Sequence, residues 1–310
     1  MRTAFIEALC EMAEEEPRLW LVCGDLGFSV LERFRDAFPN RYLNAGVAEQ
    51  NMTGMAAGLA MSGKIVFTYS IANFPVMRCL EQIRNDVCYH NANVKIVAVG
   101  GGLAYGAQGY THHGVEDLAV LRVLPNMLVI APGDPIETRL AVRALTAYPG
   151  PAYLRLGKAG EPVVHTSMPD FIPGKAILLR DGNDATLISA GGMLYTVMQA
   201  ANKLAEDGVQ VRVLSMHTIA PLDEAAVLSA ALETGGVITI EEHGAGGLGS
   251  AAAEALAMNG MATPFRMLRL PRAAESKAGS QEYLRAKHGL TVEGIQAAVK
   301  SLSSRGRDAC

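Results

Sequence analysis

The chain has 310 residues, half of them hydrophobic, and a formal net charge of −4 at pH 7. Domains usually hold roughly 100 to 200 residues, so this length predicts two of them. No apolar run approaches the roughly 20 residues of a membrane-spanning helix, and no basic stripe suggests a nucleic-acid surface. The first 18 residues are acidic and amphipathic, unlike a signal peptide. We therefore expect a cytoplasmic protein that binds neither membrane nor nucleic acid.

The cysteines are odd in number and lack Cys-x-x-Cys spacing, which favours reduced thiols over a zinc site or a disulfide framework. They are Cys10, Cys23, Cys79, Cys88 and Cys310. Reduced thiols agree with the expected cytoplasmic location.

In the first half, short Val- and Ile-rich runs alternate with longer helical patterns. Strands are predicted at LWLVCGD (19–25), KIVFTYS (64–70), VKIVAVGG (94–101) and MLVIAPGD (127–134). Helices are predicted at 2–15, 46–62, 74–90, 115–122 and 135–147. Continuous apolar strands separated by helices are typical of a parallel sheet covered on both faces.

A proline-containing segment without helical period, 157–175, is interpreted as a linker. Beyond it the alternation resumes, with strands at DATLISAGG (184–192), VQVRVLSMHT (209–218) and GVITIEEH (236–243) and helices at 194–207 and 223–233. The sequence thus predicts an α/β protein with two parallel or mostly parallel sheet domains, 1–165 and 175–310.

Open α/β sheets bind ligands beyond the carboxyl ends of their strands, and Glu49 lies in such a place. It falls in the first turn of a helix rich in glycine, alanine and methionine. An acid there can simply cap the helix. The residues one turn further are small or apolar, however, and a buried carboxylate must be hydrogen-bonded or protonated. The helix pattern alone leaves both a capping and a functional role open.

Several segments together resemble the transketolase-type thiamine diphosphate enzymes. The family's pyrimidine-binding domain is resembled by GVAEQNMTGMAAGLA (46–60), TYSIANFPVMRCLEQIRNDV (68–87) and GYTHHGVEDLAVLRVLPNMLVIAPGDP (109–135). The family's C-terminal domain is resembled by SMHTIAPLD (215–223) and EEHGAGGLGSAAAE (241–254). The resemblance spans nearly the whole chain and implies a pyrimidine-binding fold followed by a transketolase C-terminal-like domain.

The resemblance implies cofactor-binding roles for Glu49, Phe74 and Asp25. Glu49 matches the glutamate that hydrogen-bonds a ring nitrogen of the aminopyrimidine and so activates thiamine diphosphate. Phe74 matches an aromatic residue placed against that ring, and Asp25 matches a position near the cofactor. The residues themselves also allow an ordinary core phenylalanine and an aspartate that caps a turn.

His112 matches the histidine of the family's Gly-x-Thr-His motif, which contacts substrate oxygens. A histidine there can donate to a ketose carbonyl or move protons near neutral pH. Four residues earlier, Gln108 replaces the aspartate that transketolases acting on sugar phosphates usually carry. A neutral amide changes the charge and the donor pattern, so the substrate is left open.

Five further residues are predicted to bind substrate: Arg2, Ser29, Arg155 and Lys158 at a phosphate, and Arg78 facing the substrate as in the related deoxyxylulose phosphate synthases. Arginine forks suit phosphate oxygens bidentately. Each basic residue could equally be a solvated surface charge.

The family binds the diphosphate and its Mg²⁺ through a Gly-Asp-Gly segment followed by an asparagine, and this chain has none. We therefore expect a C-terminal subunit of a split transketolase. A second subunit would supply the diphosphate and metal ligands in an α2β2 heterotetramer, and no metal ligand is assigned to this chain.

The predicted reaction is transfer of a two-carbon ketol unit from a ketose or ketose phosphate to an aldose. Two alternatives stay open. One is a decarboxylating enzyme: the β subunit of a 2-oxo-acid dehydrogenase or a deoxyxylulose-phosphate-synthase-like carboligase. The other is a non-catalytic structural or regulatory subunit. The sequence does not identify the sugars, the pathway, the partner or the oligomeric state of the isolated chain.

Overall fold

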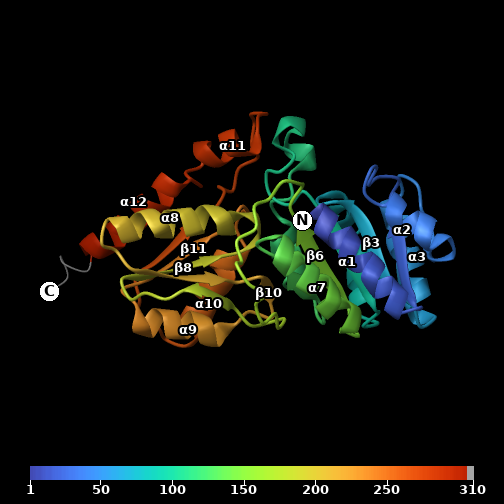
Figure 1. Cartoon of the computed structure of the whole chain (residues 1–310), viewed down its shortest axis with the longest axis horizontal. Coiled ribbons are helices and arrows are strands. Elements are labelled where there is room, and N and C mark those ends of the chain that lie inside the picture. Colours follow the sequence, from blue (N-terminus) through green and yellow to red (C-terminus); the bar gives the residue numbers. More distant parts are fainter. Residues whose placement is uncertain (306–310) are drawn as a thin grey trace.

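The computed structural model describes residues 1–305 and shows two α/β halves side by side (Figure 1). Cys310 lies outside the described residues; Cys10, Cys23, Cys79 and Cys88 are free and buried. Among helices within residues 1–305, none is long and apolar enough to cross a membrane.

The first half is built on a sheet that, in the described chain, has seven strands in the order β10-β5-β6-β4-β3-β1-β2. Their bounds are β1 Leu19–Cys23, β2 Tyr42–Asn44, β3 Ile65–Ile71, β4 Val94–Val99, β5 Leu128–Ile130, β6 Ala152–Leu156 and β10 Thr218–Ala220. All neighbours are parallel except β10, which runs antiparallel to β5. The carboxyl ends of the parallel strands therefore share one edge, where α/β proteins bind ligands.

Helices cover both faces of this sheet. Their bounds are α1 Arg2–Glu15, α2 Glu32–Ala37, η1 Pro39–Arg41, α3 Glu49–Met61, α4 Phe74–Met77, α5 Leu80–Gln82, η2 Ile83–Cys88, η3 Gly106–Gln108, η4 Tyr110–His112, α6 Asp117–Leu121 and α7 Pro135–Ala147. Helices α1 and α7 lie side by side on one face (Figure 1), over a core that includes Phe5 and Leu9. Helix α3 packs on the opposite face through Met52 and Ala56.

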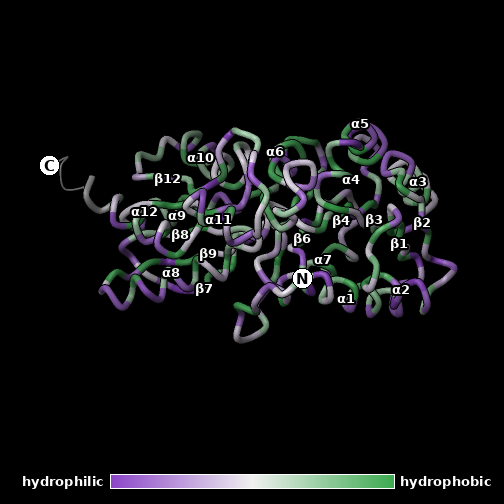
Figure 2. Tube along the Cα trace, turned by 90° about the horizontal axis from the view of Figure 1, so that it is seen from above, coloured by the Kyte–Doolittle hydropathy of each residue, from purple (hydrophilic) through white to green (hydrophobic). Residues whose placement is uncertain are grey.

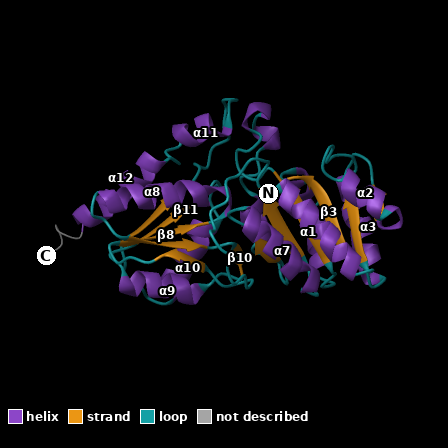
Figure 3. Cartoon of the chain, viewed as in Figure 1, coloured by secondary structure: helices purple, strands orange, loops and turns teal. Residues whose placement is uncertain are grey.

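The second half of the chain is also an α/β unit (Figure 3). Within the described residues its sheet contains five strands in the order β12-β11-β8-β9-β7. The strand bounds are β7 Ile177–Arg180, β8 Ala185–Ser189, β9 Val211–Ser215, β11 Val237–Ile240 and β12 Phe265–Leu268. The helix bounds are η5 Gly191–Met193, α8 Leu194–Glu206, α9 Glu224–Glu233, α10 Leu248–Met258, α11 Gln281–Lys287 and α12 Val292–Arg305. Only β7 is antiparallel to its neighbour. The predicted class, an α/β chain with two mostly parallel sheets, is confirmed.

The two halves are joined by more than a linker. Strand β10 belongs in sequence to the second half but completes the first sheet. One apolar cluster runs through both halves and includes Met52, Ile96, Leu214 and Leu248. Figure 2 shows hydrophobic stretches along the interior and hydrophilic ones along the periphery. Burial across the junction removes further apolar surface from water and holds the halves together.

Candidate active site

Glu49 is the first residue of helix α3 and is 1% exposed. Its backbone C=O accepts a hydrogen bond from Thr53 Oγ1 at 2.9 Å, and its Oε2 accepts one from Arg78 Nη1 at 2.5 Å. The side chain of Arg78 is 48% exposed, so the ion pair reaches from the interior to the surface. Burial of this carboxylate is compensated by the guanidinium, as the low polarity of the site requires.

Phe74 begins helix α4 and lies between His112 and Arg78, the residue that binds Glu49. The guanidinium carbon of Arg78 lies 5.2 Å from the Phe74 ring centroid, and the His112 ring meets Phe74 edge-on with a centroid distance of 5.2 Å. Phe74 and His112 are each only partly buried. The predicted residues Glu49, Arg78, Phe74 and His112 therefore form one continuous row of contacts at the sheet edge.

Tyr105 extends this row towards two of the predicted anion-binding residues. The ring centroids of Tyr105 and His112 are 6.4 Å apart, and Lys158 Nζ lies 5.1 Å from the Tyr105 ring. Burial raises the pKa of Tyr105, and the positive charge of Arg2 partly offsets that rise. Arg2 Nε is buried without a hydrogen-bond partner. Arg2 and Lys158 thus place two positive charges around Tyr105.

Asp25, Ser29 and Gln108 are exposed. Asp25 Oδ1 accepts from Asn44 Nδ2 at 2.8 Å, and the Ser29 N–H donates to Glu32 Oε1 at 2.9 Å. Asp25 follows Gly24, whose hypothetical Cβ would lie 3.6 Å from Glu49 Cγ, so this loop passes beside Glu49. Gln108 lies in the same loop as His112. Among the hydrogen bonds within residues 1–305, none joins Gln108 to another predicted site residue.

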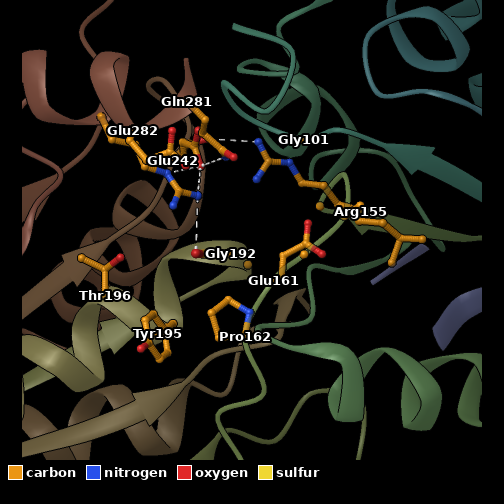
Figure 4. Close-up of a pocket in the computed structure, with 16 residues that line it drawn as sticks. Gly101, Arg155, Glu161, Pro162, Gly192, Tyr195, Thr196, Glu242, Gln281 and Glu282 are labelled. Atoms are coloured by element: carbon orange, nitrogen blue, oxygen red, sulfur yellow. Dashed lines mark hydrogen bonds and ion pairs between the residues drawn. The ribbon is translucent and has the colours of Figure 1, made fainter. Parts of the chain in front are cut away.

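Arg155 lies in a different environment from the other predicted phosphate ligands. It is 6% exposed, and its Nε donates to Asp117 Oδ2 at 2.8 Å. Its Nη2 donates to the backbone C=O of Gly114 at 2.6 Å. The same nitrogen donates to the backbone C=O of Glu242 at 3.0 Å (Figure 4). These donors bind groups inside the protein, so Arg155 supports the residues around the site. Its predicted contact with a phosphate stays a prediction.

Sequence reasoning missed Tyr105 and Glu242. Tyr105 stands in the same glycine-rich loop as His112, and its aromatic ring among glycines was an available signal. Glu242 accepts the Leu103 N–H of that loop at 2.8 Å from 139 residues away, and no local pattern announces such a contact.

Residues 1–160 match the family model described as "Transketolase, pyrimidine binding domain", and residues 174–295 match "Transketolase, C-terminal domain". The chain belongs to the transketolase family. It is 43% identical over 297 residues to a subunit of the apulose-4-phosphate transketolase of Phocaeicola vulgatus, a match that covers 95% of this chain and 94% of that protein. It is 38% identical to the 6-deoxy-6-sulfo-D-fructose transketolase subunit SqwH of a Clostridium species, over 98% and 95% of the two chains.

Among solved structures, the chain superposes on a split gene transketolase described as an inactive beta4 tetramer, with a TM-score of 0.88, 38% identity and 97% of each chain covered. The predicted family, pyrimidine-binding fold and C-terminal-like domain are confirmed, as is the likeness to the C-terminal subunit of a split transketolase. Transketolase-type relatives imply dependence on thiamine diphosphate.

The site fits one part of that cofactor. A buried carboxylate beside a partly exposed aromatic ring suits the nitrogen and the flat face of an aminopyrimidine, and the Arg78 N–H occupies the acceptor on Glu49 that a ring nitrogen would use. No cluster of three or more His, Cys, Asp or Glu side chains suited to a metal ion occurs within residues 1–305. The residues at the site therefore fit the pyrimidine part of the cofactor.

Proposed function

We propose that this chain, acting with a separate N-terminal subunit, catalyses transketolase-type transfer of a two-carbon ketol unit from a ketose to an aldose. The observation that carries this proposal is the row of contacts from Glu49 through Arg78 and Phe74 to His112. In this proposal, one member of the row binds the cofactor ring and another handles substrate protons at the same sheet edge. Thiamine diphosphate, when bound, would supply the nucleophilic carbon.

In this proposal Glu49 shares a proton with the pyrimidine nitrogen, and Phe74 packs against the ring. Because Glu49 is buried, its hydrogen bond to the ring is strengthened by the low polarity around it. Arg78 leaves Glu49 when the ring binds and turns its exposed guanidinium towards the substrate. His112 donates to, and accepts protons from, the oxygens of the sugar.

The proposed donor is a ketose with an anionic end group. Arg2 and Lys158 supply positive charge near Tyr105, on the far side of His112 from Glu49. The relatives named for apulose-4-phosphate and 6-deoxy-6-sulfo-D-fructose carry phosphate or sulfonate in their substrate names. Both anions suit the same pair of cations. Gln108, an exposed amide in the His112 loop, is proposed to select the sugar through its hydroxyls.

A partner subunit is proposed to supply the diphosphate and Mg²⁺ ligands, in an α2β2 assembly. Support comes from the relatives named as subunits and from exposed apolar side chains beside the site. Val47, two residues before Glu49, is 75% exposed. Met77, next to Arg78, lines a groove of about 350 Å³ with Phe74. A partner that covers these side chains would also exclude water from Glu49.

The decarboxylating alternative differs in its donor, and a panel of donors separates the two. The panel consists of apulose 4-phosphate, 6-deoxy-6-sulfo-D-fructose, D-fructose 6-phosphate and pyruvate. Turnover of a ketose without release of carbon dioxide from pyruvate supports the proposal, and the reverse contradicts it.

The first test is calorimetric titration of thiamine diphosphate with Mg²⁺ into the chain alone, into a mixture with the N-terminal subunit, and into the same mixture carrying Glu49→Gln. We expect binding and turnover only in the mixture. Glu49→Gln should retain binding within about tenfold and lose at least 100-fold in kcat, because a neutral amide cannot take up the proton. Tight binding by the chain alone contradicts the partner proposal; full turnover by Glu49→Gln contradicts the role of Glu49. A non-catalytic subunit predicts no effect of this substitution.

A further inference from the structure

The loop of residues 100–114 carries Tyr105, Gln108 and His112 and is closed at its base. The Gly102 N–H donates to the Gly114 C=O at 2.7 Å, and the Gly114 N–H donates to the Gly102 C=O at 3.1 Å. This pair of bonds ties the two ends of the loop together but does not place the loop relative to Phe74.

The second half of the chain holds this loop from outside. Leu103 is 1% exposed and belongs to the buried apolar cluster of the second half, which also includes Leu284 and Ile240. Backbone bonds secure two further points: the Gly279 N–H donates to the Gly106 C=O at 3.3 Å, and the Gly244 N–H donates to the Val115 C=O at 2.8 Å.

Glu242, which follows strand β11, adds a side-chain hydrogen bond to these contacts with the loop. Its Oε1 accepts the Leu103 N–H at 2.8 Å. The carboxylate is 5% exposed and is itself held from helix α11, by Gln281 Nε2 at 2.9 and 3.0 Å and by Arg285 Nε at 2.9 Å (Figure 4). A buried acceptor held on one side by two donors is pre-organised for a third donor on the other.

At Gly102 the backbone of the loop lies against Glu242. A Cβ added there would lie 2.7 Å from Glu242 Cδ, and the φ of Gly102 is +68°, so only glycine fits without strain. Arg155 closes the same junction, because its Nη2 bonds the C=O groups of both Gly114 and Glu242. Loop and carboxylate therefore form one packed unit across the two halves.

We propose that Glu242 is a positioning residue: through the Leu103 N–H it fixes the 100–114 loop and so holds His112 against Phe74. This inference rests on the role proposed above for His112. It assigns to the second half of the chain a part in the reaction without contact with cofactor or substrate. Misplacing a reacting group by about 1 Å can lower a rate as much as 100-fold, so a remote brace has a measurable effect.

The first experiment measures amide hydrogen exchange in the unliganded chain. Glu242→Asp keeps the charge but shortens the side chain by one methylene, so its oxygens no longer reach the Leu103 N–H. We expect exchange of the amides of residues 103–113 to become about tenfold faster. Glu242→Gln keeps the length and an acceptor oxygen, and should stay within about threefold of the parent. Unchanged exchange in Glu242→Asp would overturn the proposal.

The matched control is Glu241→Asp. Glu241 is equally buried and adjacent, but it accepts the N–H groups of Leu248 and Gly249 at the start of helix α10 and does not touch the loop. We expect no change in exchange at 103–113. Equal acceleration in both variants would show general loosening of the second half and would overturn the specific role of Glu242.

The second experiment measures turnover by the complete enzyme with whichever ketose of the donor panel reacts fastest. Glu242→Asp should lower kcat about tenfold and leave KM and the Kd for thiamine diphosphate within about threefold. In a His112→Ala background the same substitution should have no further effect, because the two act through one group. An equal loss of kcat in both backgrounds would show that Glu242 does not act through His112, and would overturn the proposal. Parent turnover by His112→Ala would refute the role of His112 itself, and with it this inference.

Discussion

His112 touches aromatic rings on both sides: Phe74 at 5.2 Å and Tyr105 at 6.4 Å between ring centroids. Its Nδ1 lies 3.0 Å from Thr111 Oγ1, which orients the ring and directs Nε2 away from that hydroxyl. The side chain is therefore held by neighbours while it remains partly exposed. Such an imidazole suits proton transfer to a substrate oxygen.

For His112→Ala we expect kcat to fall about 100-fold, the usual effect of losing a general acid–base group. Binding of thiamine diphosphate should change less than threefold, because the proposed ring contacts are with Glu49 and Phe74. Steady-state kinetics and calorimetry on the enzyme reconstituted with its partner check this. His90→Ala, at an exposed histidine whose Nδ1 lies 3.0 Å from the Asn85 C=O, is the control and should turn over normally. A His112→Ala enzyme with the parent kcat would rule the histidine out.

The basic residues show why local pattern alone was insufficient. Arg155 and Lys158 stand three residues apart and were both predicted to bind phosphate. Arg155 falls within strand β6, so its side chain points into the packed junction with Asp117. Lys158 follows the strand end and reaches Tyr105. The difference depends on where the strand ends, which the basic residues themselves do not reveal.

The residue before helix α7, Asp134, binds both the start of the helix and the linker. Asp134 precedes Pro135, a typical helix start, and its Oδ1 accepts the Glu137 N–H at 2.8 Å. The other carboxylate oxygen accepts the N–H groups of Val164 and His165 in the linker, at 2.9 and 3.1 Å. The cap thus also anchors the segment that joins the two halves.

For Asp134→Ala we expect the free energy of unfolding to fall by roughly 2 to 4 kcal/mol, because the cap and two linker N–H groups, one buried and one partly buried, lose their acceptor. Asp134→Asn keeps one acceptor oxygen and should cost less. Urea titration followed by the fluorescence of Trp20, the only tryptophan, measures both. A loss below about 0.5 kcal/mol in Asp134→Ala would contradict this account.

The predicted helix 74–90 divides into α4, α5 and the π-helical η2. Its side chains Val76, Cys79, Ile83 and Val87 are all buried, in agreement with the helical period. The interruption near Cys79 lets Phe74 and Arg78 face the site while the later turns pack below. Periodicity predicts the buried face, whereas the break depends on contacts with α3 and β3.

Two buried histidines lie where the halves of the molecule meet. His217 stacks on Phe171 of the linker at 3.9 Å, and its C=O accepts the Ala131 N–H of the first half at 2.7 Å. His243 Nε2 lies 3.5 Å from Asp117 Oδ1. Burial lowers the pKa of each to about 4, although nearby carboxylates, Glu137 for His217 and Asp117 for His243, oppose the shift.

These values predict that acid weakens the fold. The histidine pKa in the unfolded chain is about 6.5, so between pH 6.5 and 4 the unfolded chain binds more protons and the free energy of unfolding falls. His165 has the opposite sign. Burial lowers its pKa, but the bond to Glu137 and the negative charges of Glu137 and Asp134 together raise it, so its contribution is complete below pH 6.5 and is lost as pH rises through the folded pKa.

For His217→Gln we expect the difference in unfolding free energy between pH 7 and pH 4.5 to shrink by about 2 kcal/mol. Urea titrations of the parent and the variant at the two pH values measure this. His90→Gln, at an exposed position, should keep the parent difference. An unchanged difference in His217→Gln would show that folding does not shift the pKa of this ring and would contradict the prediction.

The amino-acid sequence by itself determined the family, the two-sheet α/β class and most regular elements. Helices α1 and α7 have the bounds that apolar periodicity and Pro135 predict. These features depend on contacts between neighbours in sequence or on motifs of fixed spacing, such as that around Glu49. Strands β2, β6, β7, β10 and β12 were not predicted. Strands β2, β7, β10 and β12 are short and lie at sheet edges, whereas β6 is central but carries Arg155 within its apolar run.

Tertiary structure alone decided which predicted residues meet. It paired Arg78 with Glu49, turned Arg155 inward, and brought Tyr105 between His112 and Lys158. It also joined the second half to the first through β10, Leu103 and Glu242. The bond between Leu103 and Glu242, for example, links residues 139 positions apart. Such contacts depend on how the two sheets and their helices pack together, and a single sequence holds no local signal for such distant partners.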